Sequence, residues 1–150
     1  MVDGHAHSEL DNFEPCKFKV ESIEYYSAEN YYQCQKTTTP EDHEKVRKSG
    51  CGADVWRVGS HVKIKPNWES IKVNQMYLGN KAKFEQNEHI AKQLCATKGK
   101  ITFRGSTAFW NEWNAAIMER IRAEMRQSGE EDTKTIERIT KAMSQYEKEH

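Results

Sequence analysis

The sequence predicts an α+β fold: a single helix-rich domain with a small β element, plus a C-terminal amphipathic helix. Hydrophobic residues recur at every third or fourth position over most of the chain after residue 67, which is the spacing of a helix with one buried face. Alternation with period two is confined to residues 18–25, where it indicates short strands. A chain of 150 residues is long enough for one domain with its own core and too short for two ordinary ones.

The β element is expected directly before the first helix. Two alternating segments, 18–20 and 23–25, are separated by Glu21-Ser22, which predicts two strands joined by a tight turn. Ser27 fits the N-cap of the helix that follows, since a serine hydroxyl can accept a hydrogen bond from a free amide of the first helical turn.

The later elements follow from helical periodicity and from residues that break helices. The first helix is expected to end before Pro40, because proline cannot continue a helix. Gly50-Cys51-Gly52 ends a second, polar helix, and Ser128-Gly129 ends the last helix of the domain. In chain order, we predict helices over 28–36, 41–49, 67–86, 88–96 and 107–127, an irregular segment over 53–66, and a strand over 100–103.

Three parts are predicted along the chain: a flexible N-terminus over residues 1–10, the domain over 11–127, and an accessory helix within 130–150. The accessory helix places its few hydrophobic residues three or four positions apart on an otherwise charged segment: Ile136, Ile139, Met143 and Tyr146. Such a stripe predicts a helix that packs on the domain or on a second subunit.

Charge and cysteine content limit the classes of protein. Lys+Arg 23 balances Asp+Glu 23, which argues against binding nucleic acid mainly by phosphate neutralisation but allows a local basic pocket for a nucleotide. The four cysteines form no C-x-x-C pair, as expected of reduced thiols. The polar start lacks a signal peptide, and no apolar run approaches the roughly 20 residues that cross a bilayer. We therefore expect a cytoplasmic or nuclear protein without membrane contact.

Two short motifs are too weak to indicate a ligand site. His5 and His7 form an H-x-H pair without a cluster of further ligands, so no metal site is expected. Gly50-Cys51-Gly52 is too short for a phosphate-binding loop and lacks the Lys-Ser/Thr that follows one. No cofactor is expected either.

One face of the first helix carries a set of groups suited to chemistry. Glu29, Gln33 and Lys36 stand at positions i, i+4 and i+7, so they share a face that is about 10 Å long. The simpler interpretation is an exposed ladder of polar side chains. Against it, tyrosines are concentrated around these residues, and the helix lacks the further charges of a solvated face.

These residues belong to a longer resemblance, which covers about 10–126. The chain resembles the NADAR (YbiA-like) N-glycosidase family, and the block from Tyr25 to Lys36 is the most specific part of the match. The matching residues are Asn12-Phe13, Pro15, Phe18, Ile23-Glu24-Tyr25-Tyr26-Ser27-Ala28-Glu29-Asn30-Tyr31-Tyr32-Gln33, Lys36, Arg57, Gly59, Trp68, Met76, Lys83-Phe84, Leu94, Thr97, Trp110, Asn114 and Ile121-Arg122.

The resemblance implies cleavage of a bond between ribose C1 and an amino group outside the ring of a base. Some members act on phosphorylated ribosylaminopyrimidine intermediates of riboflavin synthesis, and others remove ADP-ribose from guanine in nucleic acid. Lys36 would be the nucleophile, which displaces the base and leaves a Schiff base, and Glu29 would move the protons. If the bond instead breaks through an oxocarbenium ion, Glu29 can still be the acid, but a cationic Lys36 would be misplaced.

The resemblance also implies a substrate-binding set. Gln33 would hold a ribose hydroxyl or orient Glu29, Arg57 would contact a phosphate or form a surface ion pair, and Trp110 would stack on a base. Lys83 and Arg122 would line the pocket or be solvated. The complete set of expected substrate-binding residues is Asn12, Phe13, Tyr32, Gln33, Arg57, Trp110 and Asn114.

Departures from the family pattern bear on the substrate. Asn30 replaces a frequent histidine, and the loop between Trp110 and Asn114 is much shorter than usual, which favours a larger, ADP-ribosyl substrate. Three functions follow: removal of ADP-ribose from guanine in DNA or RNA, hydrolysis of a related ribosylamine nucleotide of riboflavin biosynthesis, or non-catalytic binding of ADP-ribose. The oligomeric state is left open.

Overall fold

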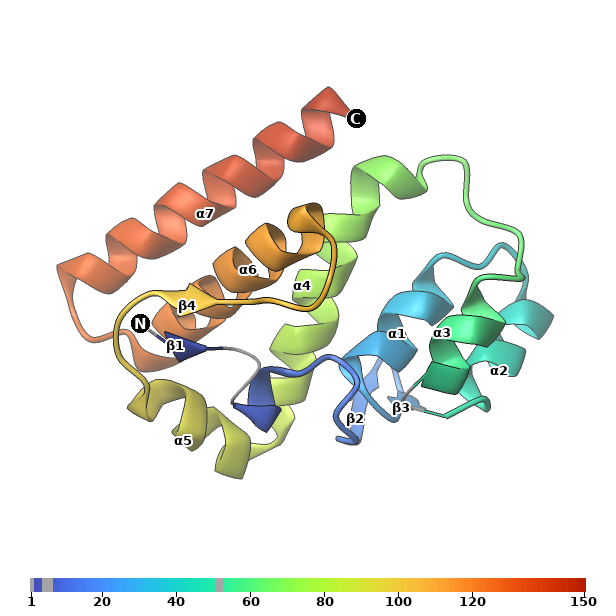
Figure 1. The fold of residues 1–150 in the computed structure, drawn as a ribbon, viewed down its shortest axis with the longest axis horizontal. Helices are drawn as coiled ribbons and strands as arrows, with labels where there is room; N and C mark the ends of the chain where they lie inside the picture. The colour runs from blue at the N-terminus through green and yellow to red at the C-terminus, as the bar shows by residue number, and fades with distance from the viewer. Residues whose placement is uncertain (1, 4–6, 51–52) are drawn as a thin grey trace. The chain divides into compact units, whose positions relative to one another are not determined.

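The structure is a computed structural model that describes residues 2–3, 7–50 and 53–150 (Figure 1). His5 of the H-x-H pair and Cys51-Gly52 lie outside the described residues. Contacts within the chain define two compact units, which we describe separately. The N-terminal unit is Asn12–Asn87 with His150, and the C-terminal unit is Met1–Asp11 with Glu88–Glu149. The predicted domain boundaries are not tested by this division and stay a prediction.

The N-terminal unit begins with the predicted β-hairpin. Strands β2 (Phe18–Val20) and β3 (Ile23–Tyr25) pair antiparallel, with Phe18 opposite Tyr25. Glu21 and Ser22 both have positive φ, 52° and 69°, as a two-residue hairpin turn of the primed kind requires. The two strands and their turn are therefore confirmed.

Helices α1 (Ala28–Gln35), α2 (Pro40–Arg47), α3 (Ala53–Gly59) and α4 (Trp68–Gln86) complete this unit. Ser27 is the N-cap of α1, and its Oγ accepts a hydrogen bond from the N–H of Asn30 at 2.9 Å. The Asn30 side chain donates to the carbonyl oxygens of Arg47 and Gly50, so it holds the end of α2 against α1. Asn30 thus has a structural role.

Helix α3 corrects the prediction that residues 53–66 are irregular. Val55 is fully buried and Val58 packs on the same hydrophobic cluster, so a short helix with two inward valines lies within that range. Trp56, the largest side chain of the helix, is 57% exposed. Because the aromatic residue faces outward and the helix is short, its periodicity is not visible in the sequence.

The core of the N-terminal unit is aromatic. The rings of Phe18, Tyr25 and Tyr31 lie 5.0 to 6.2 Å apart between centroids, and Cys34, Val46 and Val55 complete the cluster. Gly79 of α4 faces Tyr31, and a Cβ at this position would lie 2.5 Å from the ring atom Cδ1. The glycine therefore allows α4 to approach α1 closely.

The C-terminal unit contains a second, two-stranded sheet and three helices. Strand β1 (Val2–Asp3) pairs in parallel with β4 (Ile101–Thr102), and a 3-10 turn, η1 (Ser8–Leu10), packs on α5 (Glu88–Ala96). Leu10 is fully buried. The described residues of the N-terminal segment thus contact this unit through β1 and η1, and the flexible N-terminus over residues 1–10 stays a prediction.

Helices α6 (Ala108–Arg126) and α7 (Glu130–Glu149) form an antiparallel pair in the C-terminal unit (Figure 1). Tyr146 of α7 contacts the rings of Phe109 and Trp113 at 5.7 and 5.6 Å. At the turn, Arg126 forms an ion pair with Asp132 at 2.7 Å. The predicted tail helix is confirmed, and its apolar stripe packs on α6 of the same chain.

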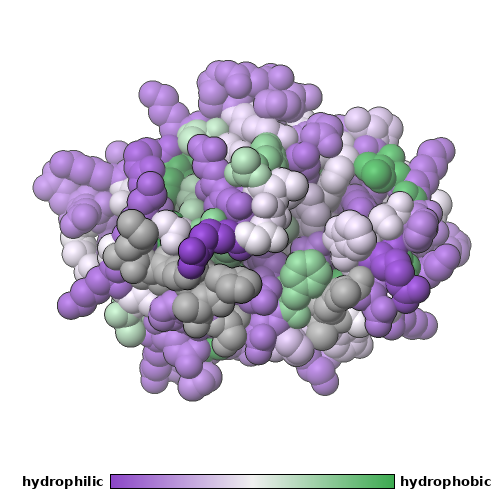
Figure 2. Space-filling model, viewed as in Figure 1, coloured by the Kyte–Doolittle hydropathy of each residue, from purple (hydrophilic) through white to green (hydrophobic). Residues whose placement is uncertain are grey.

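The helix-rich α+β class with a small antiparallel element is confirmed. Among the described residues, no helix combines the length and the apolar character that crossing a membrane requires. Hydrophilic residues cover most of the face drawn in Figure 2.

Candidate active site

The polar face of α1 is buried, contrary to the simpler interpretation of a solvated ladder. Glu29 is 6% exposed and Gln33 is 3% exposed. Nε2 of Gln33 donates a hydrogen bond to Oε1 of Glu29 at 2.7 Å. Because the helix places these side chains one turn apart, the amide orients the carboxylate, which is one of the two roles expected of Gln33.

Lys36 stands two turns after Glu29, at the C-cap of α1, and its side chain is half-buried. Burial lowers the pKa of the Lys36 amine below its ordinary value of 10.5, and the negative charge of Glu29 opposes part of this effect. The two groups therefore interact electrostatically. The amine loses its proton more readily than that of an exposed lysine, as a nucleophile requires.

The backbone around Lys36 is held by a distant segment of the chain. The N–H of Lys65 donates to the carbonyl oxygen of Lys36 at 2.9 Å, and Thr37 forms an isolated antiparallel bridge with Ile64. These bonds fix the end of α1 to residues 64–65 and so restrict the position of the Lys36 backbone.

Asn12 lies at the opposite end of α1, where its carbonyl oxygen accepts the N–H of Glu29 at 2.8 Å. Its side chain is buried, and Oδ1 accepts a hydrogen bond from Nδ2 of Asn80 at 3.0 Å. The neighbouring Phe13 is 39% exposed. Asn80, on α4, has no distinguishing signal in the sequence, and only the fold brings it to Asn12.

Gly59, the last residue of α3, contacts the side chain of Gln33. A Cβ at Gly59 would lie 2.3 Å from Oε1 of Gln33. No described residue donates a hydrogen bond to this buried Oε1. The absence of a side chain at Gly59 therefore leaves room for the rotamer in which Gln33 points its NH2 group at Glu29. Gly59 belongs to the family resemblance, but sequence reasoning assigned it no role.

Tyr32 and Arg57 lie in different surroundings. The Tyr32 ring packs against Trp68, with centroids 5.0 Å apart, and both residues are buried. The Arg57 side chain is 69% exposed and pairs with Asp54 at 3.0 Å, which is the surface ion pair expected as the alternative to a phosphate contact. Their roles in substrate binding stay predictions.

Trp110 and Asn114 lie on α6 in the C-terminal unit, one helical turn apart. The Trp110 ring contacts Phe109 edge-on at 5.0 Å, and Asn114 is buried. The segment between them, expected to be a shortened loop, is a continuous turn of α6. The roles of both residues toward the substrate stay predictions.

Lys83 and Arg122 are both buried, so the alternative that they are solvated is wrong. Arg122 donates from Nη1 to Oγ1 of Thr97 at 3.1 Å and from Nη2 to the carbonyl oxygen of Gly99 at 2.6 Å. These bonds tie α6 to the chain after α5, which is a structural role.

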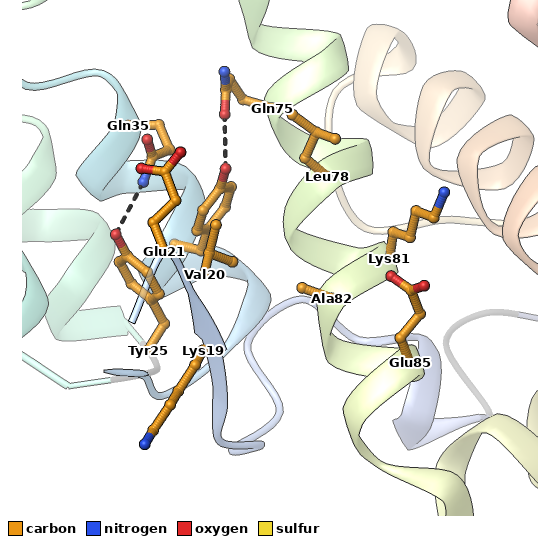
Figure 3. A pocket seen from close by; sticks show the side chains of 11 residues that line it. Lys19, Val20, Glu21, Tyr25, Gln35, Gln75, Leu78, Lys81, Ala82 and Glu85 are labelled. Carbon is orange, nitrogen blue, oxygen red and sulfur yellow. Dashed lines mark hydrogen bonds between the residues drawn. The ribbon is translucent and has the colours of Figure 1, made fainter. Parts of the chain in front are cut away.

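A cavity of about 510 Å³ lies on the other side of α1, between the β2–β3 hairpin and α4 (Figure 3). The Gln35 amide donates to the Tyr25 hydroxyl at 3.3 Å, and the Tyr31 hydroxyl donates to Oε1 of Gln75 at 2.9 Å. None of the predicted site residues lines this cavity.

The N-terminal unit thus brings together a buried carboxylate and an amine whose pKa burial lowers, both on one rigid helix. Acid–base catalysis combined with Schiff-base formation requires these two functional groups. Glu29, Gln33 and Lys36 are brought together as predicted, Asn12 joins them through the start of α1, and Arg57 lies on the surface of α3.

Comparison with known proteins agrees with this description. The NADAR domain family matches residues 2–110, and the chain belongs to that family. It is 26% identical to the N-glycosidase YbiA of Escherichia coli over 110 residues, which are 71% of this chain and 69% of YbiA. The NMR structure of E. coli YbiA has a TM-score of 0.67 and 25% sequence identity, and the match covers 79% of this chain and 76% of that one.

A second relative is a riboflavin biosynthesis protein of Vibrio vulnificus. It is 34% identical over 111 residues, which are 71% of this chain. The chain spans only 30% of the length of that relative.

Proposed function

We propose that this chain hydrolyses the bond between ribose C1 and the exocyclic amine of a base, and that it removes ADP-ribose from guanine in nucleic acid. Its NADAR family includes relatives named N-glycosidase, and hydrolysis of an N-glycosyl bond is the reaction class of this chain. The observation that carries the mechanism is the buried Glu29 two turns from Lys36, whose pKa burial lowers.

Lys36 acts as the nucleophile. The sugar ring opens when the bond between C1 and the ring oxygen breaks, which leaves an imine between C1 and the amine of the base. Nζ of Lys36 attacks C1, the two protons of its amine pass to the base nitrogen, and the bond from C1 to that nitrogen breaks, so the base departs as the free amine and C1 is left as an imine with Nζ. The remaining imine between Lys36 and C1 reacts with water, which releases the sugar as the aldehyde and returns the amine.

Glu29 moves the protons in these steps. It protonates the ring oxygen or the departing amine in turn, and as a carboxylate it accepts a proton from the attacking water. The hydrogen bond from Gln33 at 2.7 Å keeps one carboxylate oxygen fixed during these transfers.

The surroundings of Lys36 favour this route over one through an oxocarbenium ion. A lysine that stays protonated would repel the positive charge that develops at C1 in such a transition state. Burial lowers the pKa of Lys36, so its amine is neutral more often than that of an exposed lysine, and a neutral amine next to C1 is suited to attack it.

The proposed substrate is an ADP-ribosyl adduct of guanine. The proposal rests on the short segment between Trp110 and Asn114, where α6 continues without the longer loop of the family pattern. A ribosylaminopyrimidine substrate is the second candidate, favoured by the relative named for riboflavin biosynthesis. A non-catalytic ADP-ribose reader is the third, and the presence of both Glu29 and Lys36 argues against it.

The decisive experiment is borohydride reduction during turnover, followed by mass spectrometry of peptides. We expect a stable sugar adduct on Lys36 with the wild-type protein and none with Lys36→Ala. Turnover without an adduct, or normal rates for Lys36→Ala, would reject the covalent route. Turnover of an ADP-ribosylated oligonucleotide and of a ribosylaminopyrimidine phosphate, measured side by side, decides the substrate, and binding of ADP-ribose without release of base from either would favour the reader.

A further inference from the structure

One stretch of the N-terminal unit carries a local excess of positive charge. Between Asp54 and Glu69 the sequence contains no aspartate or glutamate but contains three basic residues: Arg57, Lys63 and Lys65. The whole chain has a formal net charge of +0, so this excess is not a property of the overall composition. We call residues 56–65 the basic segment.

The basic segment also presents two large hydrophobic side chains to solvent. Trp56 is 57% exposed and Ile64 is 48% exposed, more than any other large hydrophobic residue that the structure describes. Lys63 is exposed as well. Within the described residues, the side chains of Lys63 and Lys65 form no ion pair, so both charges are available to a partner.

This segment is attached directly to the helix end that carries Lys36. The N–H of Lys65 donates to the carbonyl oxygen of Lys36 at 2.9 Å, and Ile64 pairs with Thr37. A polymer bound along the basic segment would therefore run past the end of α1, next to the proposed nucleophile.

We propose that the basic segment binds the single strand of nucleic acid that carries the modified base. Lys63 and Lys65 contact phosphates, and Trp56 stacks on an unpaired base. Free ammonium groups and an exposed indole on one short segment are the combination that binds single strands without regard to sequence. A duplex suits this surface less well, because its bases are already stacked on each other. The proposal rests on the function proposed above, and it specifies the nucleic acid that carries the modified guanine as a single strand held by residues 56–65.

The first test measures binding separately from catalysis. Fluorescence anisotropy of a dye-labelled, unmodified single-stranded DNA oligonucleotide gives its affinity over a series of salt concentrations. For Lys63→Ser/Lys65→Ser we expect weaker binding and a salt slope smaller by about 1.4, since each phosphate contact to a single strand contributes about 0.7. For Trp56→Ala we expect about tenfold weaker binding from lost stacking.

The matched control is Lys141→Ser/Lys148→Ser, which removes two exposed lysines of α7, outside the residues 2–110 that the family match covers. This control should bind as the wild type does. Equal affinity and equal salt slope for Lys63→Ser/Lys65→Ser and the wild type would overturn the proposal. Circular dichroism of each variant establishes that it folds.

The second test uses turnover of two substrates that differ only in the strand. We expect Lys63→Ser/Lys65→Ser to lower kcat/KM about tenfold for an ADP-ribosylated oligonucleotide and to leave it unchanged for ADP-ribosylated guanosine. Equal losses of kcat/KM for both substrates would show that the two lysines support the active site and do not bind the strand. That result would overturn the proposal. If the wild type turns over neither substrate, the proposed function fails, whereas the anisotropy result still decides whether the segment binds a strand.

Discussion

The two buried faces of α1 serve different purposes. One face carries Glu29, Gln33 and Lys36, which supply a buried carboxylate, a buried amide and a half-buried amine. The opposite face carries Tyr31, whose ring packs in the aromatic core and whose hydroxyl donates to Gln75. Burial raises the pKa of Tyr31 to about 12, so it stays neutral.

The Glu29 face contains interactions that lower the free energy of unfolding, and the Tyr31 face does not. Burying a charge or leaving a buried oxygen without a donor is unfavourable, and both occur on the Glu29 face only, where Oε1 of Gln33 has no donor among the described residues. Each face also meets one glycine at close range, Gly59 at Gln33 and Gly79 at Tyr31. Paired substitutions can therefore separate a face used for chemistry from a face used for folding.

The largest expected effect is that of Glu29→Gln on rate. The amide keeps the shape of the side chain but cannot transfer protons, so kcat should fall by about 100-fold or more, measured as base release under saturating substrate. Tyr31→Phe, on the opposite face, is the control and should keep the wild-type rate. A loss below about threefold for Glu29→Gln would remove Glu29 from the chemistry, because general acid–base catalysis contributes far more than that.

Gly79→Ala should act on stability. The new Cβ would lie 2.5 Å from the Tyr31 ring, which packs against Phe18 and Tyr25 in the core and would have to shift, so we expect a loss of about 1–3 kcal/mol in the free energy of unfolding. Urea denaturation measures this loss. The kcat of the folded protein should not change. A large fall in kcat under conditions in which the variant is fully folded would show that the Tyr31 face of α1 also affects catalysis.

Gly59→Ala should lower the rate more than the stability, the opposite of what we expect for Gly79→Ala. The added methyl group displaces the end of the flexible Gln33 side chain, which removes its hydrogen bond to Glu29 at little cost in packing. We expect kcat to fall about tenfold, the scale of one lost hydrogen bond to a charged group, with a smaller loss of stability than Gly79→Ala causes. Loss of stability without loss of rate would show that Gly59 serves packing alone.

The smallest effect concerns pH. The attacking amine must be neutral, so kcat/KM should rise as pH rises through the pKa of Lys36, which burial lowers from 10.5. The negative charge of Glu29 raises this pKa. In Glu29→Gln, the rise of the residual kcat/KM with pH should therefore occur at lower pH than in the wild type. A pH–rate profile of both proteins measures this shift. If kcat/KM rises at the same pH or at a higher pH in Glu29→Gln, the rise does not reflect the titration of Lys36.

Much of the fold could be predicted from local pattern. The hairpin turn at Glu21-Ser22, the N-cap at Ser27 and the ends of α4 and α5 depend on neighbouring residues, and each was predicted within a residue or two. Helix α3 was missed because only Val55 and Val58 of its short span face inward. The pairing of β1 with β4 could not be predicted, since it joins residues about a hundred positions apart that carry no shared signal.

For the site, the sequence by itself determined which groups share a helical face, because 3.6 residues per turn places positions 29, 33 and 36 together wherever that helix packs. Only the tertiary structure decided that this face is buried, that Gly59 leaves room for the Gln33 side chain, and that Lys65 fixes the end of α1 at Lys36. The physical reason is the sequence separation of the interacting residues. Helix periodicity depends on residues close together in the sequence, whereas burial and the pKa of an amine depend on distant segments that meet only when the chain has folded.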